Sequence, residues 1–355
     1  MSSKENWIDQ AKIELNGKDP KEFLSKNHSE VTIEPYYDAS DSLPNTEILY
    51  EKEAIPFHGP NGWLNLPSIK NFTDDKANTL ALQHLQCGAD GIFFQIDESS
   101  NVEKLVKEIE PEYCFLGFEA NEAALKFFKE LVQHFSFGPL HGTFVRSDLT
   151  FPLGRSMQND LLAMANLFKG YKKFRCHGLV VKDGNETMEI ALVMQTVLAI
   201  VDELTDYGFH AQSVFEQISF SMNSSSNFFL DVAKIRSLKI LMKRLADAYQ
   251  VQSTPTFIRV VCATDVTENY QPHGSLLSNS FSALAAAFAS AEAITIITDS
   301  PNSDRHVQTA RNVSLLLREE AKLDKVIDPL AGSFFVEQLT YMLVEKAWAT
   351  IIEKK

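Results

Sequence analysis

Eight short apolar runs, separated by longer amphipathic stretches, most constrain how this chain of 355 residues can fold. Most of the runs are continuous rather than alternating, as in Gly91–Asp97 and Ala293–Thr298. A continuous apolar run is typical of a strand buried on both faces, and such strands occur in parallel sheets covered by helices. The predicted strands are Trp63–Lys70, Gly91–Asp97, Tyr113–Glu119, Gly142–Ser147, Cys176–Lys182, Ile218–Asn223, Ile258–Thr264 and Ala293–Thr298.

The stretches between and after these runs carry apolar residues at helical spacing. The clearest predicted helices are Asn121–Phe135, Glu189–Tyr207, Phe228–Tyr249, Val307–Leu317 and Phe335–Ile351. Asn227 precedes the third of these and is a suitable helix cap. Eight strands with helical connections predict a (β/α)8 TIM barrel. A doubly wound open sheet is the alternative, but no Gly-x-Gly-x-x-Gly turn follows the first strand to favour it.

The first part of the chain lacks the alternation of strands and helices that a barrel requires. Trp7–Leu15 is amphipathic and ends near Gly17, and an irregular stretch containing proline follows. We therefore expect residues 1–50 to form an N-terminal extension arm that contacts another subunit. Residues 51–355 are expected to form the barrel.

Composition excludes several classes of function. The chain has 33 basic and 47 acidic residues, a net charge of -14, so binding to nucleic acid or to an anionic membrane is not expected. Met1–Trp7 has no apolar signal core, and no apolar run is long enough to span a membrane. The four cysteines of the chain form no C-x-x-C pair, which is typical of buried reduced thiols in a cytoplasmic protein.

Several ordered segments of the chain carry a resemblance to a known family. They are Arg311–Val313, Arg318–Glu320, Asp328–Glu337, Asn227–Arg236, Ser282–Phe288 and the N-terminal pattern Trp7–Pro20. In order and spacing these segments resemble the methylmalonyl-CoA mutase family. The resemblance implies an eight-stranded barrel that threads the pantetheine arm of an acyl-CoA along its axis. It also implies that in the active subunit a separate C-terminal domain holds adenosylcobalamin, whose radical chemistry interconverts methylmalonyl-CoA and succinyl-CoA.

The chain departs from this family at positions that contact the substrate. Where active members have Gly-Tyr-His after the fifth strand, this chain has Gly178-Leu179-Val180, and valine cannot donate a hydrogen bond to the thioester carbonyl. In the fourth strand Thr143 is retained, but Val145 stands in place of the family's substrate-contacting glutamine.

Three more positions are matched to the family through the resemblance. Gln158 takes the place of the arginine that binds the substrate carboxylate, so the bidentate partner is lost. Phe57 lies in the loop whose tyrosine helps displace the adenosyl group. Arg236 matches an arginine near the CoA-binding region but is equally compatible with a surface charge. Thr143 and Arg236 are therefore the candidate vestigial substrate-binding residues, and no catalytic residue is expected.

Polar residues at the fifth strand allow two interpretations. His177 has no His, Asp or Glu partner at metal-binding spacing, so a hydrogen-bonded core or rim histidine is favoured over a metal ligand. Asp183 and Glu186 follow the strand where barrel active sites form. They could act as an acid–base pair, although a capped helix start explains them as well.

These observations lead to three hypotheses. The first is a non-catalytic small subunit of an adenosylcobalamin-dependent methylmalonyl-CoA mutase, inactive alone and paired with the catalytic large subunit in a heterodimer. No Asp-x-His-x-x-Gly motif occurs in the sequence, so this chain is not expected to bind adenosylcobalamin by itself. The second is the catalytic barrel of a split acyl-CoA mutase with an altered substrate and a separate cobalamin-binding chain. The third is a metabolite-binding barrel without a mutase partner.

Overall fold

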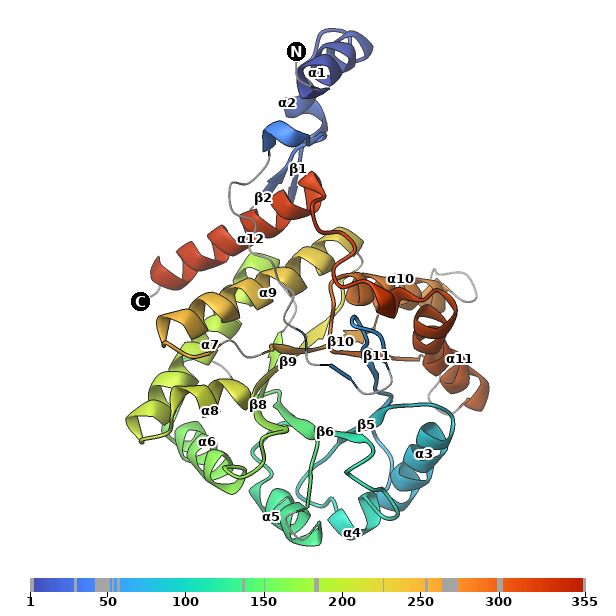
Figure 1. The fold of residues 1–355 in the computed structure, drawn as a ribbon, viewed down its shortest axis with the longest axis vertical. Coiled ribbons are helices and arrows are strands. Elements are labelled where there is room, and N and C mark those ends of the chain that lie inside the picture. Colours follow the sequence, from blue (N-terminus) through green and yellow to red (C-terminus); the bar gives the residue numbers. More distant parts are fainter. Residues whose placement is uncertain are drawn as a thin grey trace.

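The computed structural model describes residues 3–28, 31–41, 52, 54–55, 58–135, 138–149, 151–181, 185–225, 227–252, 255–263, 274–298 and 303–353. In these residues an α/β fold is formed by a curled parallel sheet with helices around it (Figure 1). The strands are β3 (Leu64–Asn65), β4 (Ser68–Ile69), β5 (Gly91–Gln95), β6 (Phe115–Ala120), β7 (Gly142–Arg146), β8 (Phe174–Val181), β9 (Ile218–Asn223), β10 (Phe257–Cys262) and β11 (Ala293–Ile296).

The strand order explains the curl of the sheet. The order is β3-β11-β10-β9-β8-β7-β6-β5-β4, and every neighbouring pair is parallel. Only Leu66 and Pro67 separate the two end strands in sequence, so β3 and β4 are halves of one interrupted strand. The Leu66 amide donates to the Ile294 carbonyl (3.0 Å), and Pro67 accepts from Phe93 (2.9 Å). The arrangement is consistent with the predicted TIM-like barrel, and each predicted strand segment overlaps an observed strand.

Helices cover the outer face of the sheet (Figure 1). They are α3 (Asp74–Gln86), α4 (Val102–Leu105), α5 (Leu125–His134), α6 (Arg155–Leu167), α7 (Glu186–Asp206), α8 (Ala211–Glu216), α9 (Phe228–Ala248), α10 (Gly274–Phe288) and α11 (Asp304–Leu315). The last helix, α12 (Phe334–Glu353), packs outside α7 and α9. Asn227 caps α9 as predicted, because its side chain accepts from the Leu230 amide (3.3 Å). The start of α5 was predicted too early, since Ala124 adopts a left-handed conformation immediately before the helix. Within the described residues, no helix is long and apolar enough to cross a membrane.

Outward-facing strand residues pack beneath the helices. Phe128 of α5 is fully buried, and its ring contacts those of Phe118 (5.7 Å between centroids) and Phe144 (4.5 Å) on the strands below. Edge-to-face and tilted aromatic pairs of this kind add to the stability that comes from burying apolar area. The outer core therefore holds the helices on the sheet independently of the residues that face the centre of the barrel.

The region around Arg311–Glu320, which carries part of the family resemblance, holds the first strand in place. Trp63 donates from its indole nitrogen to the Ser314 hydroxyl of α11 (2.9 Å). Beyond α11, a π-helical turn over Leu316–Glu320 places the Arg318 guanidinium against the Trp63 carbonyl (3.0 Å) and the Asp90 carboxylate (2.8 Å). These contacts hold α11 and the turn after it against the start of β3.

Residues 3–28 and 31–41 form a separate group of elements beyond α12 (Figure 1). They are α1 (Ser3–Glu14), α2 (Pro20–Leu24), the antiparallel pair β1 (Lys26–His28) and β2 (Val31–Ile33), and the short helix η1 (Ala39–Asp41). The Tyr37 ring packs on Phe335 of α12, with centroids 5.6 Å apart. No barrel strand lies in this group, but a role of residues 1–50 in contacting another subunit remains a prediction.

Candidate functional site

The centre of the barrel is filled by side chains from strands on opposite sides of the sheet. Its buried apolar cluster comprises Leu66, Phe93, Phe115, Val145, Phe257 and Ala293, with Leu64 and Val180 packed against it. Alternate residues of the same strands, such as Phe94 and Leu116, belong to the outer core. Because side chains alternate across a strand, the first set faces the lumen of the barrel.

Two aromatic contacts cross this lumen. The Arg259 guanidinium of β10 lies over the Phe93 ring of β5, 3.3 Å from its centroid. The rings of Phe115 on β6 and Phe257 on β10 stack at 5.1 Å. Neither β5 nor β6 neighbours β10 in the sheet, so these contacts are formed through the middle of the barrel.

Polar contacts hold Arg259 in this apolar setting. It donates to the Ser221 hydroxyl from two guanidinium nitrogens (3.1 and 2.9 Å) and lies 3.5 Å from the Glu119 carboxylate. Glu119 also pairs with Lys70 (3.2 Å), above β4. Burial lowers the pKa of Arg259 to about 10, with Glu119 opposing the shift, so the side chain is charged at neutral pH.

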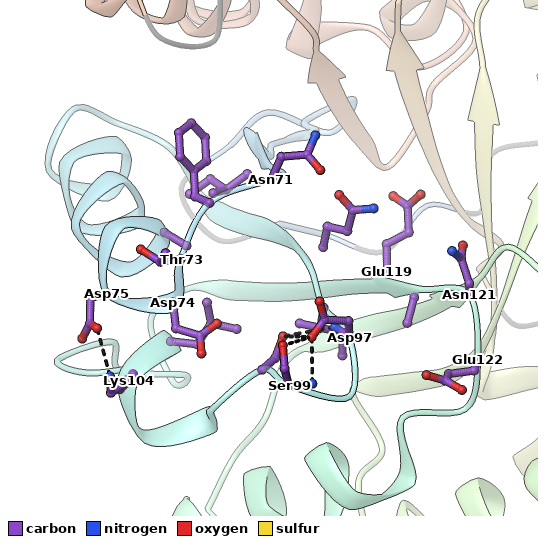
Figure 2. A pocket seen from close by; sticks show the side chains of 18 residues that line it. Asn71, Thr73, Asp74, Asp75, Asp97, Ser99, Lys104, Glu119, Asn121 and Glu122 are labelled. Atoms are coloured by element: carbon purple, nitrogen blue, oxygen red, sulfur yellow. Dashed lines mark hydrogen bonds and ion pairs between the residues drawn. The ribbon is translucent and has the colours of Figure 1, made fainter.

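An upper cavity of about 850 Å³ lies beside the C-terminal ends of β4, β5 and β6 (Figure 2). Its lining includes the carboxylates of Asp74, Asp75, Asp97, Glu119 and Glu122 and the single lysine Lys104. Lys104 is paired with Asp75 (3.0 Å), and hydrogen bonds from Ser99 lower the pKa of Asp97 and keep it ionised. The cavity is therefore acidic, and its field disfavours an anionic ligand such as an acyl-CoA.

A lower cavity of about 440 Å³ lies at the opposite end of the barrel. Phe115, Phe257 and Arg175, near the N-terminal ends of their strands, form part of its lining. The Arg175 guanidinium lies over the Phe257 ring, 4.7 Å from the centroid. The upper and lower cavities share no lining residue, and neither is lined by Phe93 or Arg259.

The structure brings three of the sequence-predicted site residues into the lumen. Thr143 is buried, shares a hydrogen bond with the Ser219 hydroxyl (2.6 Å) and donates to the Arg175 carbonyl (3.1 Å). Val145 lies in the buried lumen cluster and Val180 packs against it. At both valine positions the lumen surface is therefore apolar, as the sequence predicts.

The other predicted site residues do not join them. Gln158 lies on α6 and donates to Glu203 of α7 (3.0 Å). Arg236 lies on α9, where it is buried and pairs with Glu337 of α12 (2.8 Å) and with Asp328 (3.4 Å). Neither residue lines the two cavities described above. Phe57 lies outside the described residues.

At the fifth predicted strand, the described polar residues His177 and Glu186 occupy structural positions. His177 is 1% exposed on β8, which confirms the core placement, but neither ring nitrogen has a hydrogen-bond partner, so the expectation of a hydrogen-bonded ring was wrong. Burial, together with the charge of Arg146, lowers its pKa to about 3. Glu186 begins α7 after the cap Asn185 and pairs with His28 (3.2 Å), and Asp183 lies outside the described residues. Among the residues that the structure describes, no group of three or more His, Cys, Asp or Glu side chains could hold a metal ion.

Sequence reasoning missed the lumen residues Phe93, Gly117 and Arg259. Arg259 did offer a signal, because it is a lone charged residue inside the apolar run Ile258–Thr264. A buried charge needs specific partners, so such a residue marks a place where the interior is polar. Gly117 and Phe93 offered none, since their relation depends on the pairing of two strands.

Sequence comparisons with known proteins point to one family. A family model described as methylmalonyl-CoA mutase matches residues 139–354. The methylmalonyl-CoA mutase small subunit of Porphyromonas gingivalis is 26% identical, over 98% of this chain and 62% of that protein. The small subunit from Propionibacterium freudenreichii subsp. shermanii is 30% identical over 46% of this chain and 27% of its own length. That of Streptomyces virginiae is 22% identical over 94% of this chain and 59% of its own. The chain thus spans less than two thirds of the length of each of these relatives.

Proposed function

Because this chain belongs to the methylmalonyl-CoA mutase family, we propose that it is a non-catalytic small subunit of such a mutase. In this role it forms a heterodimer with a catalytic large subunit, which carries out the interconversion of methylmalonyl-CoA and succinyl-CoA. Small subunits among its relatives, similar over 94–98% of this chain, support the assignment. A cytoplasmic location is expected for such a complex.

The observation that carries this proposal is the filled lumen. A barrel that binds an acyl-CoA along its axis needs a continuous space there and polar groups near the thioester. Here Phe93 and Arg259 lie across the lumen, and Val145 and Val180 present only methyl groups. An apolar side chain cannot stabilise the charge that develops on a thioester carbonyl.

We do not expect this chain to bind adenosylcobalamin by itself. The side chains that line the upper cavity include no histidine, so the described chain offers no imidazole ligand for cobalt there. In the holo-complex we expect the large subunit to hold the cofactor.

The split-enzyme alternative makes a different demand on the barrel. A catalytic barrel that borrows a cobalamin-binding chain must still admit and orient its substrate. The stacked pair Phe115 and Phe257 and the buried Arg259 occupy the space that the substrate would need. The lumen geometry therefore favours the non-catalytic role.

Reconstitution tests the proposal directly. The chain would be purified and mixed with a methylmalonyl-CoA mutase large subunit from the same host, and complex formation would be followed by size-exclusion chromatography with light scattering. We expect a one-to-one complex with an obligate-type interface of more than ~2,000 Å². The chain alone should give no succinyl-CoA from methylmalonyl-CoA, with or without adenosylcobalamin.

The large subunit with its own catalytic histidine replaced is the matched control. If activity of the complex survived that replacement, catalysis would lie on this chain and the proposal would fail. Turnover by this chain with only a short cobalamin-binding protein would establish the split enzyme instead. Failure to form any complex with the mutase chain would also count against the small-subunit role.

A further inference from the structure

Phe93 of β5 fills space that its strand partner leaves open. Phe93 and Gly117 are register partners on β5 and β6, and the Phe93 ring is fully buried. A Cβ atom on Gly117 would come within 2.1 Å of the ring, far closer than any real contact. The ring therefore lies directly over the glycine, on the lumen side of the sheet.

Arg259 covers a face of this ring. Its guanidinium stacks on Phe93, and its bonds to Ser221 anchor it to the neighbouring strand β9. A guanidinium this close to an aromatic face is held by cation–π attraction, which is strongest where water is excluded. We refer to Phe93 and Arg259 as the plug.

Along strand β6, the plug lies at a level between the residues that line the two cavities. On β6, Phe115 lines the lower cavity and Glu119 lines the upper one, while Gly117 under the plug lines neither. The stacked rings of Phe115 and Phe257 both line the lower cavity. The plug therefore lies above the Phe115–Phe257 pair in the lumen.

We propose that the plug makes the barrel axis impassable to an extended ligand, and that Phe93 determines this exclusion. The excluded ligand is a flexible chain of amide and methylene groups that ends in a thioester, as in the pantetheine arm of an acyl-CoA. This inference rests on the proposed function, because it is that function that makes an acyl-CoA the relevant ligand. It adds that Phe93 closes the axis above the Phe115–Phe257 pair, so its removal should give an extended ligand room from the upper end of the barrel.

Phe93→Ala is the direct test, since it removes the ring over Gly117 and leaves the polar contacts of Arg259 in place. The probe is free pantetheine, which lacks the nucleotide and so reports on the axis rather than on the barrel mouth. Binding would be measured by isothermal titration calorimetry on the purified full chain. We expect at least a 10-fold gain in affinity over the wild-type chain.

Phe118→Ala is the matched control. Phe118 is equally buried but belongs to the outer core beneath α5, so its removal leaves the lumen closed. We expect no gain in pantetheine binding for this variant. Phe93→Leu, a smaller change, is a second test if the alanine variant fails to fold, and it should show a smaller gain in the same direction.

Three outcomes would overturn the inference. They are wild-type binding as tight as that of Phe93→Ala, a folded Phe93→Ala or Phe93→Leu variant without any gain, and an equal gain in Phe118→Ala. None of these depends on the large subunit or on turnover. The binding assay therefore tests the inference about the plug, and the reconstitution assay tests the small-subunit role separately.

Discussion

Phe93 and Gly117 face each other on neighbouring strands, and the ring of one occupies the space that a side chain on the other would need. The pair explains how a ring as large as phenylalanine fits in the lumen of a narrow barrel. The complementarity is steric, so it depends on the size of both residues together. Paired substitutions at the two positions can therefore test the complementarity.

Gly117→Ala should lower the free energy of unfolding by roughly 1–3 kcal/mol, because the new methyl group overpacks the lumen. Urea denaturation would measure the loss. Gly170→Ala is the control, since no atom lies within 4 Å of its added Cβ. In the double variant with Phe93→Leu the loss should be smaller than the sum of the single losses. Simple additivity would show that the two residues do not share space.

Arg236 is predicted to stabilise the contact between α9 and α12 rather than to bind a ligand. Arg236→Met would leave the largely buried carboxylates of Glu337 and Asp328 without their cation, which costs roughly 3–5 kcal/mol. Arg244 joins the same two helices through Glu345 but is much more exposed, so Arg244→Met should cost less than about 1 kcal/mol. Chemical denaturation of both variants gives the comparison. Equal losses would contradict the assignment.

Asp90 should be a strong determinant of stability at the N-terminal end of the barrel. Its carboxylate accepts from the Asn65 amide (2.7 Å) and from Arg318 (2.8 Å), and Asp90→Asn removes the charge that balances the buried guanidinium. We expect a loss of roughly 3–5 kcal/mol in urea denaturation. Asp75→Asn, which breaks the exposed pair with Lys104, should lose less than about 1 kcal/mol. A small effect at Asp90 would mean that Arg318 finds another partner.

His177 should make stability fall in mild acid. Burial depresses its pKa to about 3 in the folded chain, whereas the unfolded chain titrates near 6.5, so the unfolded state binds more protons between these values. Its contribution is fully present above pH 6.5 and is lost as pH falls toward 3, at up to roughly 1.4 kcal/mol per pH unit.

The check is urea denaturation of His177→Leu and of the wild-type chain from pH 7 to pH 4.5. The difference between the two free energies of unfolding should change with pH, because leucine does not titrate. His84, whose pKa burial lowers to about 4, contributes in the same direction and remains in both proteins. A constant difference across this range would show that His177 becomes protonated in the folded state.

The sequence alone determined the parts of this protein that depend on local pattern. Continuous apolar runs marked the strands, because a strand covered on both faces has no polar side to display. Asn227 marked a helix start, since its side chain replaces a missing backbone acceptor. The loss of hydrogen-bonding capacity at Val145 and Val180 was also readable, because it depends only on residue type.

Only the tertiary structure decided which side chains meet. Phe93 and Phe94 are identical in type and adjacent in sequence, but the sheet turns one into the lumen and the other into the outer core. Arg236 matched a family position, but its helix directs it to α12, where carboxylates compensate its charge. The plug joins β5 to β10, which lie on opposite sides of the barrel and 166 positions apart at Phe93 and Arg259. Contacts of this kind depend on strand register and barrel curvature, which arise when the whole chain packs and not from any local segment.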